Sequence, residues 1–225
     1  MDEGKINPLT ATLAVVRLAR EAGARVEAFA GVLAMERRGE AWEVATEAGT
    51  IRARRVVNCA GGWASRVAAM AARPIPVKGA PLQMIVTEPG PPLVKHLVAH
   101  ASRHLSLKQA LTGGLVIGGA WPATLDPETG ASHVERASIE GNAWVAAHVL
   151  PPAACLRVLR AWAGMNIDID GAPILGEMPG APGFFNCVTS NGYSLAPVVA
   201  EITADLMTRG VCDHPHAMFT LDRFG

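Results

Sequence analysis

The clearest chemical signal in this sequence is a glycine turn that opens a long apolar-periodic segment near the C-terminus. The turn has the sequence Asn191-Gly192-Tyr193-Ser194, and Leu195 begins the apolar face of the expected helix. The first N–H groups of a helix have no intrahelical acceptor, and the helix dipole adds partial positive charge there. Such an end suits a ligand that carries partial negative charge. The alternative is an ordinary capped helix after a tight turn, with Ser194 as its N-cap.

The second candidate is a run of small residues, Ala60-Gly61-Gly62, directly after an expected buried strand at 55–59. Small residues between a strand and a helix let a ligand approach the backbone closely. A plain turn without a ligand is the alternative, because Gly-Gly often does no more than end a strand. With or without a ligand, we expect a strand, then the Ala60-Gly61-Gly62 turn, then a helix.

Histidines offer a weaker case for chemistry. His96, His100 and His104 recur at a spacing that would place three zinc ligands on one helix face. Their surroundings indicate a loop and a strand instead, so we expect no metal site. His214 and His216 lie in an expected irregular tail.

The cysteines are widely separated and form no C-x-x-C motif. Because such spacing is typical of a reducing compartment, we expect free, mostly buried thiols and no disulfide. No histidine pairs with them in the sequence, so a catalytic thiol is not expected. The residues concerned are Cys59, Cys155, Cys187 and Cys212.

The expected elements begin with a helix at 8–22, which Asn7-Pro8 starts and Gly23 ends. Its apolar residues recur at i, i+4, i+7, which predicts one buried stripe made of Leu9, Leu13 and Val16. Alternation of period two then predicts a short antiparallel meander, with strands at 26–30, 42–46 and 51–53 and turns at 38–40 and 48–50.

A Pro-rich junction at 73–76 opens a second region. We expect it to be based on a sheet, with strands at 82–87, 104–108 and 115–119 and a helix near 134–149. A buried strand at 183–189 then leads into the last helix, whose apolar face is Leu195, Val199, Ile202 and Leu206 and whose stop is Gly210. Residues 73–163 thus form a domain inserted into another.

The composition excludes several classes of partner. The chain has 225 residues, of which 50% are hydrophobic, and its 20 basic and 20 acidic residues cancel. We therefore expect a globular core, no nucleic-acid partner and no attraction to an anionic membrane. The N-terminus has no apolar signal core and no stretch is long enough for a membrane span, so we expect a cytoplasmic location.

Four segments near the C-terminus together resemble the flavin-binding signature of the FAD-dependent amino acid and amine oxidoreductases related to D-amino acid oxidase. They are Arg160-Ala-Trp-Ala-Gly164, Asp170-Gly-Ala-Pro-Ile-Leu-Gly176, Pro182-Gly183 and Ser190-Asn-Gly-Tyr-Ser-Leu-Ala-Pro197. The segment 53–64 is similar to another pattern of this family and departs from it only in having Cys59 at a position that is usually alanine. The sequence has no G-x-G-x-x-G, which is the family's dinucleotide-phosphate loop.

The resemblance implies an α/β (α+β) fold. Its parts are an incomplete FAD-binding Rossmann-like domain, at 1–72 and 164–225, and an inserted substrate-binding domain with a mixed or antiparallel sheet, at 73–163. The segments Gly118-Gly119-x-Trp121, Lys108-Gln109 and Asn191-Gly-Tyr look most like the β subunits of sarcosine or opine oxidases.

The resemblance also implies where FAD contacts this chain. The start of the last helix lies against the isoalloxazine ring, whose N1–C2=O2 edge gains negative charge on reduction. The turn after strand 55–59 faces the ribose and pyrophosphate, and the residue after Gly31 lies on the adenine side. The implied cofactor contacts are Val32, Cys59, Ala60, Gly61, Asn191, Gly192, Tyr193, Ser194 and Leu195.

Three side chains are implied as catalytic in the family's reaction, which takes a hydride from the carbon beside an amine nitrogen. Lys108 could stabilise anionic flavin or oxygen species, unless it is an ordinary exposed lysine. Asn166 stands where family members that act on amino acids usually have a carboxylate-binding arginine, which disfavours simple D-amino acids. Tyr193, the only tyrosine, could donate a hydrogen bond or simply pack.

Two functions stay open at this point. The first is an FAD-dependent oxidase or dehydrogenase of a small amine or amino acid, with a sarcosine- or opine-like secondary amine favoured and with partner subunits or a homo-oligomer as its assembly. The second is a truncated or non-catalytic fragment or subunit, which binds FAD only when a missing N-terminal half or a partner supplies the phosphate-binding βαβ unit. Loss of that unit would expose a sheet edge and favour association.

Overall fold

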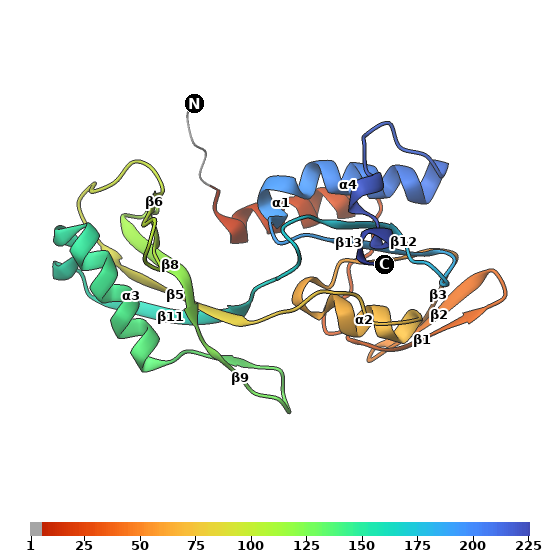
Figure 1. Cartoon of the computed structure of the whole chain (residues 1–225), viewed down its shortest axis with the longest axis horizontal. Helices are drawn as coiled ribbons and strands as arrows, with labels where there is room; N and C mark the ends of the chain where they lie inside the picture. Colours follow the sequence, from red (N-terminus) through yellow and green to blue (C-terminus); the bar gives the residue numbers. More distant parts are fainter. Residues whose placement is uncertain (1–5) are drawn as a thin grey trace. The chain divides into compact units, whose positions relative to one another are not determined.

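A computed structural model of the chain describes residues 6–225 (Figure 1). Helices and strands form a mixed α/β fold, as the sequence predicts. The chain divides into two compact units. One consists of residues 80–166 and is called the inserted unit; the other consists of 6–79 together with 167–225 and is called the flanking unit.

The flanking unit is built around a three-stranded sheet. Its strand order is β12 (Ile174–Glu177), β13 (Phe184–Val188) and β4 (Val56–Asn58), with β13 antiparallel to β12 and parallel to β4. Helix α4 (Gly192–Arg209) contacts β12 and β13, and α2 (Ala64–Ala71) contacts β13 and β4. The strand, glycine turn and helix expected at 55–70 are confirmed, with a short 3-10 helix at Gly61–Trp63 between β4 and α2.

A meander of three antiparallel strands packs against α2 in the same unit. It consists of β1 (Val32–Arg38), β2 (Ala41–Thr46) and β3 (Gly49–Ala53). The expected strand at 26–30 is wrong, because β2 already pairs with β1 on one side and β3 on the other. Trp42 fixes the meander to the core: its ring lies 5.9 Å from that of Phe184, and its Nε1–H donates to the carbonyl of Pro182 at 3.0 Å.

Helix α1 (Pro8–Glu21) confirms the expected helix at 8–22. The Asn7 side-chain oxygen caps it by accepting from the backbone N–H groups of Leu9 and Thr10 at 3.1 and 3.3 Å. The expected buried stripe is wrong, because no residue of α1 is buried and Leu9 and Leu13 are 77% and 69% exposed. The apolar side of the helix is present in the sequence, but no described segment covers it.

The inserted unit holds a five-stranded antiparallel sheet. Its strand order is β11 (Val158–Met165), β5 (Pro81–Pro89), β8 (Gly114–Pro122), β7 (Ser106–Gln109) and β6 (Val98–Ala99). Helix α3 (Arg136–Val149) covers one face, where Val145 and Ala146 share a core with Ile85 and Leu107. A two-stranded ribbon, β9 (Thr124–Leu125) with β10 (Ser132–His133), and a 3-10 helix at Pro151–Cys155 complete the unit.

The tail after α4 folds back onto the core of the flanking unit. It contains short 3-10 helices at Ala217–Phe219 and Leu221–Phe224. Leu221 is buried in the cluster that holds Trp42 and Phe184. The guanidinium of Arg223 forms an ion pair with the carboxylate of Asp170 at 2.7 Å. Within residues 6–225, no helix combines the length and apolar character needed to cross a membrane.

Candidate functional site

Two loops of the flanking unit leave its sheet side by side. Strands β4 and β13 run parallel, with Val56 opposite Phe184 and Asn58 opposite Asn186. The carboxyl ends of parallel neighbours lie at the same edge of a sheet, so the Ala60-Gly61 turn adjoins the loop that leads into α4. Ligands of open α/β sheets bind at this edge. The two glycine turns singled out in the sequence therefore share one place in the fold.

Asn58 holds the first of these loops in shape. It is only 2% exposed, and its amide group donates to the carbonyl of Ala64 at 2.9 Å and to the side-chain oxygen of Asn186 at 3.1 Å. Its own oxygen accepts from the backbone N–H of Ala60 at 3.2 Å. One buried amide therefore ties the turn to the start of α2 and to the neighbouring strand. Sequence analysis missed this residue, although an asparagine inside a buried strand is itself a signal.

The second loop ends in a helix N-terminus that is open to solvent. Helix α4 begins at Gly192, and no side chain forms a capping hydrogen bond with it. The expectation that Ser194 caps the helix is wrong, because the helix begins three residues earlier than that cap requires and Asn191 takes the N-cap position. The first intrahelical hydrogen bond runs from the N–H of Leu195 to the carbonyl of Asn191 at 2.9 Å. N–H groups of the first turn are thus available to a ligand.

The side chain of Tyr193 turns toward α1. Its hydroxyl lies 2.8 Å from the Thr12 hydroxyl and donates to the carbonyl of Pro8 at 3.1 Å. These contacts fix the start of α1 beside the start of α4. Val32, the expected contact on the adenine side, lies at the beginning of β1 opposite Thr46 and is partly exposed.

The cysteines differ from expectation in their exposure. All four are free thiols, but Cys59 and Cys155 are exposed and Cys187 and Cys212 are only half-buried. The expectation of mostly buried thiols is therefore wrong. Cys59 is the first residue after the edge strand β4, and Cys155 ends a short 3-10 helix; both positions face water.

Lys108 and Asn166 belong to the inserted unit and lie on the sheet face opposite α3. Leu107, the neighbour of Lys108, packs into the α3 core, so alternation along β7 turns Lys108 to the other face. On β11, Ala161 packs into the same core; Trp162 and, by alternation, Asn166 therefore share the face of Lys108. Three strand spacings separate β7 from β11, on the order of 15 Å. One small reacting group cannot contact both side chains.

The motif residues beside Lys108 have structural roles. The Gln109 amide donates to the carbonyls of Pro91 and Gly113 at 2.7 and 2.8 Å. Trp121 donates from its Nε1–H to the carbonyl of His104 at 2.7 Å. Gly119 has φ 122°, and a Cβ there would lie 2.3 Å from the backbone nitrogen of Leu105. These residues set the shape of the sheet and its loops.

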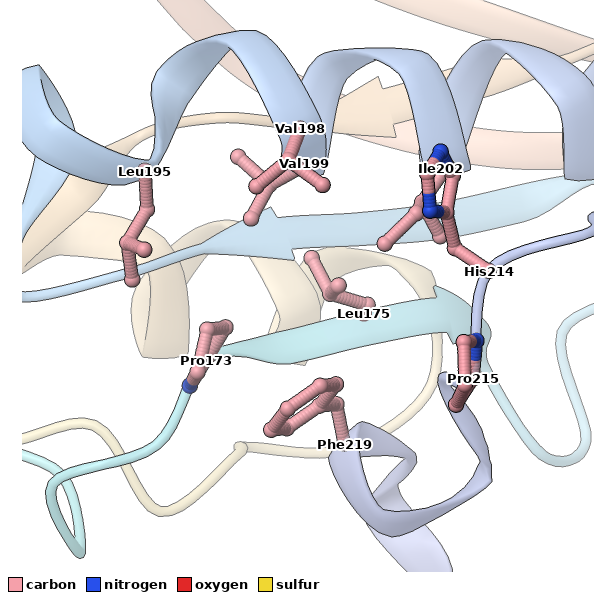
Figure 2. A pocket seen from close by; sticks show the side chains of 9 residues that line it. All are labelled: Pro173, Leu175, Leu195, Val198, Val199, Ile202, His214, Pro215 and Phe219. Atoms are coloured by element: carbon pink, nitrogen blue, oxygen red, sulfur yellow. The ribbon is translucent and has the colours of Figure 1, made fainter.

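An apolar pocket of about 200 Å³ lies between α4, β12 and the tail (Figure 2). Among the sequence candidates for cofactor contact, only Leu195 reaches it. The complete lining is Pro173, Leu175, Leu195, Val198, Val199, Ile202, His214, Pro215 and Phe219. This lining suits an apolar group, and His214 is the one lining residue with a polar side chain.

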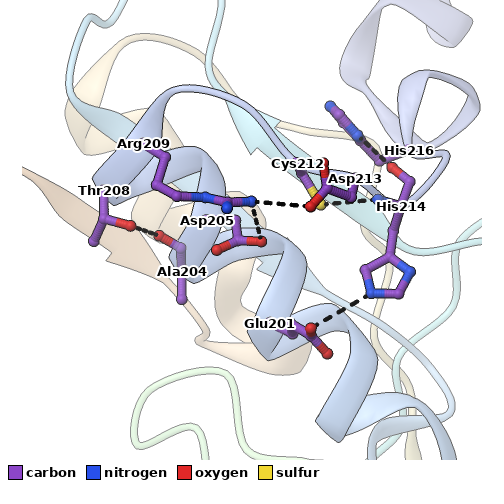
Figure 3. A network of polar contacts seen from close by, with 9 residues as sticks. All are labelled: Glu201, Ala204, Asp205, Thr208, Arg209, Cys212, Asp213, His214 and His216. Carbon is purple, nitrogen blue, oxygen red and sulfur yellow. Dashed lines mark hydrogen bonds and ion pairs between the residues drawn. The ribbon is translucent and has the colours of Figure 1, made fainter.

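Polar side chains of α4 and of the tail that follows it are paired with one another, as Figure 3 shows. His214 Nε2 lies 3.6 Å from a carboxylate oxygen of Glu201, and Arg209 lies 2.9 Å from Asp205 and 3.5 Å from Asp213. Across residues 6–225, no three His, Cys, Asp or Glu side chains come together as a group that could hold a metal ion.

Comparison with known proteins decides the family. A family model described as FAD dependent oxidoreductase matches residues 1–206. The chain belongs to this family. It is 31% identical over 186 residues to the beta chain of the sarcosine oxidase of Rhizobium meliloti (strain 1021), a match that covers 80% of this chain and 43% of that protein. It is 29% identical over 216 residues to the glycine oxidase of Bacillus subtilis (strain 168), covering 92% of this chain and 55% of that protein.

Solved structures show the same fold. The glycine oxidase from Geobacillus kaustophilus matches with a TM-score of 0.84 and 25% identity, over 93% of this chain and 56% of that one. The L-proline dehydrogenase from P. horikoshii matches with a TM-score of 0.83 and 24% identity, over 98% of this chain and 60% of that one. The chain thus spans about half the length of the relatives it matches.

The geometry of the flanking unit fits the family's cofactor. The exposed N-terminus of α4 offers N–H donors to an electron-rich ring edge, and a Cβ added at Gly192 would meet no atom within 4 Å. Gly61 has φ 58°, a conformation that glycine adopts without strain, and its neighbour Ala60 is also small. The turn at Gly192 therefore leaves room for a ligand against the backbone, whereas a Cβ at Gly61 would lie 3.5 Å from the side chain of Ile167.

Proposed function

We propose that this chain is part of a flavoenzyme that oxidises the C–N bond of an amino acid or a secondary amine, of sarcosine or opine type, by hydride transfer to FAD. The observation that carries the proposal is the shared sheet edge, where the Ala60-Gly61 turn adjoins the open N-terminus of α4. Family membership supports it. Bound FAD would supply the hydride acceptor, while this chain orients reactants, excludes water and supplies electrostatics.

The flanking unit would hold FAD mainly through its backbone. The proposed contacts at the isoalloxazine ring are Asn191, Gly192, Tyr193, Ser194 and Leu195; those at the ribose, pyrophosphate and adenine are Cys59, Ala60, Gly61 and Val32. The N–H groups at the start of α4 are fixed in direction by the helix. They would stabilise negative charge at the ring edge without having to reorganise.

The inserted unit would supply side chains from the sheet face opposite α3. Lys108 would place a positive charge near the flavin, and Asn166 would hydrogen-bond the substrate. Because these two side chains lie far apart on the sheet, we assign them to different ends of the site. The Tyr193 hydroxyl is engaged with α1. We therefore propose that its backbone acts on the cofactor and its ring positions α1.

We infer further that a companion polypeptide segment completes the FAD site. Among residues 6–225, β4 pairs with β13 on one side and with no strand on the other, and Val57 on it is partly exposed. The apolar side of α1 is also exposed. An unpaired strand edge and an uncovered apolar helix face in the same unit favour the addition of a strand and its helix. A βαβ unit with a G-x-G-x-x-G loop would fill that role and bind the pyrophosphate.

The relatives favour an assembly of more than one polypeptide. Several of them carry names that mark them as single subunits, in one case of a sarcosine oxidase and in another of an opine oxidase. We therefore propose partner subunits, or a homo-oligomer, for the complete enzyme. The cytoplasmic location expected from the sequence stays a prediction.

Flavin retention tests the companion and the cofactor separately. The purified chain is mixed with FAD and desalted, alone and after co-expression with the part of the Bacillus subtilis glycine oxidase that lies outside the match to this chain. We expect flavin absorbance to stay with the pair and not with the chain alone. Stoichiometric flavin on the chain alone would contradict the companion, and no flavin on either would contradict the cofactor assignment. An amine panel on the flavin-bound pair then tests the substrate class; simple D-amino acids as the best substrates would contradict the role of Asn166.

A charge placed at the start of α4 tests the helix directly. Asn191→Asp keeps the size of the side chain but adds negative charge beside the proposed ring edge. We expect FAD affinity to fall about three- to tenfold, as a loss of helix-terminus stabilisation predicts. Ala200→Asp adds the same charge to an exposed position further along the same helix and serves as the control. Equal FAD affinity in both variants would place the flavin elsewhere.

A further inference from the structure

The two parallel strands at the sheet edge share a short sequence pattern. The chain reads Val56-Val57-Asn58 along β4, followed directly by Cys59, and Phe184-Phe185-Asn186-Cys187 along β13. The register pairs Asn58 with Asn186, and the hydrogen bond between their side chains, at 3.1 Å, shows that they lie side by side. One residue further along, Cys59 is therefore the neighbour of Cys187, on the opposite face of the sheet.

The two thiols are in direct contact. The S–H of Cys59 donates a hydrogen bond to the sulfur of Cys187. Neighbouring strands place paired Cα atoms about 4.8 Å apart, within the roughly 4.4–6.8 Å that disulfides span. A bond between these sulfurs would therefore require no large backbone movement.

The surroundings make the pair both accessible and reactive. Cys59 is exposed, while Cys187 is half-buried beside α4, with its sulfur 3.8 Å from the carbonyl oxygen of Val199. The hydrogen bond from Cys59 lowers the pKa of Cys187 from 9.0 to about 6. The same bond raises the pKa of Cys59, because that thiol is the donor. At neutral pH the pair therefore carries one thiolate, which is the nucleophilic form.

We propose that Cys59 and Cys187 form a reversible oxidation site, in which hydrogen peroxide converts the two thiols into a disulfide between β4 and β13. The Cys187 thiolate attacks a peroxide oxygen; the O–O bond breaks, hydroxide leaves and takes up a proton, and a sulfenic acid remains on Cys187. The Cys59 sulfur then attacks the Cys187 sulfur, the S–O bond breaks and water leaves with the Cys59 proton. Two electrons from the thiols thus reduce one peroxide to two waters. The site does not depend on flavin binding.

Peptide mapping tests this site cleanly, because trypsin places each cysteine on a different peptide: 56–66, 137–157, 161–209 and 210–223. The chain is treated with hydrogen peroxide, blocked with N-ethylmaleimide and digested without reductant. We expect a disulfide that joins 56–66 to 161–209 and disappears on reduction. Separate sulfinic or sulfonic acids on Cys59 and Cys187 would overturn the proposal, as would equal cross-linking of Cys155 or Cys212.

Variants separate this reaction from random oxidation. Cys155→Ser removes an exposed thiol away from the pair and should leave the cross-link unchanged. Cys59→Ser should abolish the cross-link while it keeps a hydroxyl donor next to Cys187, so Cys187 should still alkylate with iodoacetamide at pH 7. Cys59→Ala lacks the donor, and alkylation of Cys187 at pH 7 should become slower. Equal alkylation rates in the serine and alanine variants would show that the two thiols do not interact.

Discussion

Replacement of Asn58 by alanine should destabilise the flanking unit by about 3 kcal/mol, at roughly 1 kcal/mol for each buried hydrogen bond lost. The variant loses three hydrogen bonds, to the carbonyl of Ala64, the side chain of Asn186 and the N–H of Ala60. The Asn186 side chain is itself buried, and its Nδ2 already lacks a partner among the described residues. Without Asn58, the Oδ1 of Asn186 is also left unpaired. The free-energy cost is therefore higher than for the loss of an exposed hydrogen bond.

Urea unfolding followed by tryptophan fluorescence measures this loss, and amide hydrogen exchange over residues 56–71 locates it. We expect faster exchange at the turn and at the start of α2 in the alanine variant. Ser190→Ala changes an exposed side chain at the same sheet edge and should alter stability by no more than about 0.5 kcal/mol. A loss below about 1 kcal/mol in Asn58→Ala, with unchanged exchange at the turn, would refute the view that this amide holds the loop.

Three further predictions concern the same unit. The ion pair with Arg223 lowers the pKa of Asp170 to about 2, from 3.8, so its contribution to stability is present above pH 3.8 and is lost as the pH falls toward 2; urea midpoints should show a shallower acid loss in Asp170→Asn, and an unchanged slope would contradict this role. Gly183→Ala should cost about 2 kcal/mol more than Gly180→Ala in the same assay, because both glycines have positive φ but only at Gly183 would a Cβ lie 2.8 Å from a backbone oxygen; equal costs would exclude the clash. Leu221→Ala should cost about 3 kcal/mol by emptying a core position, and a thermal or urea midpoint close to that of the parent chain would show that the tail does not close the core.

Local signals in the sequence predicted most of the elements. The helix at 8–22 follows from a cap and a proline at its start, and the chain at 55–70 follows from a strand, two glycines and an apolar-periodic run. These features act within a few residues, so a single sequence contains them. The open start of α4 was also expected, but its cap was placed at Ser194 because side-chain preference shows which residues can cap and not where the helix begins.

Contacts between distant segments could not be predicted in the same way. The period of Leu9 and Leu13 shows which side of α1 is apolar, but it does not show what covers that side. The adjacency of the two glycine turns depends on the pairing of β4 with β13, whose asparagines are 128 residues apart. Once that pairing is known, the repeated Asn-Cys pattern acquires meaning, and the cysteines are a contacting pair. Considered singly, each looks like an isolated small residue.

The insertion of one unit into the other determines the order in which the protein can mature during synthesis. The inserted unit is continuous in sequence, so all of its strands are made before the second segment of the flanking unit, and domains tend to fold as units when they emerge. The core of the flanking unit joins Trp42 to Leu221, which is made after the whole inserted unit. The first segment of the flanking unit therefore cannot complete this core until Leu221 has been made. During that interval the early segment is the part of the molecule most dependent on chaperones.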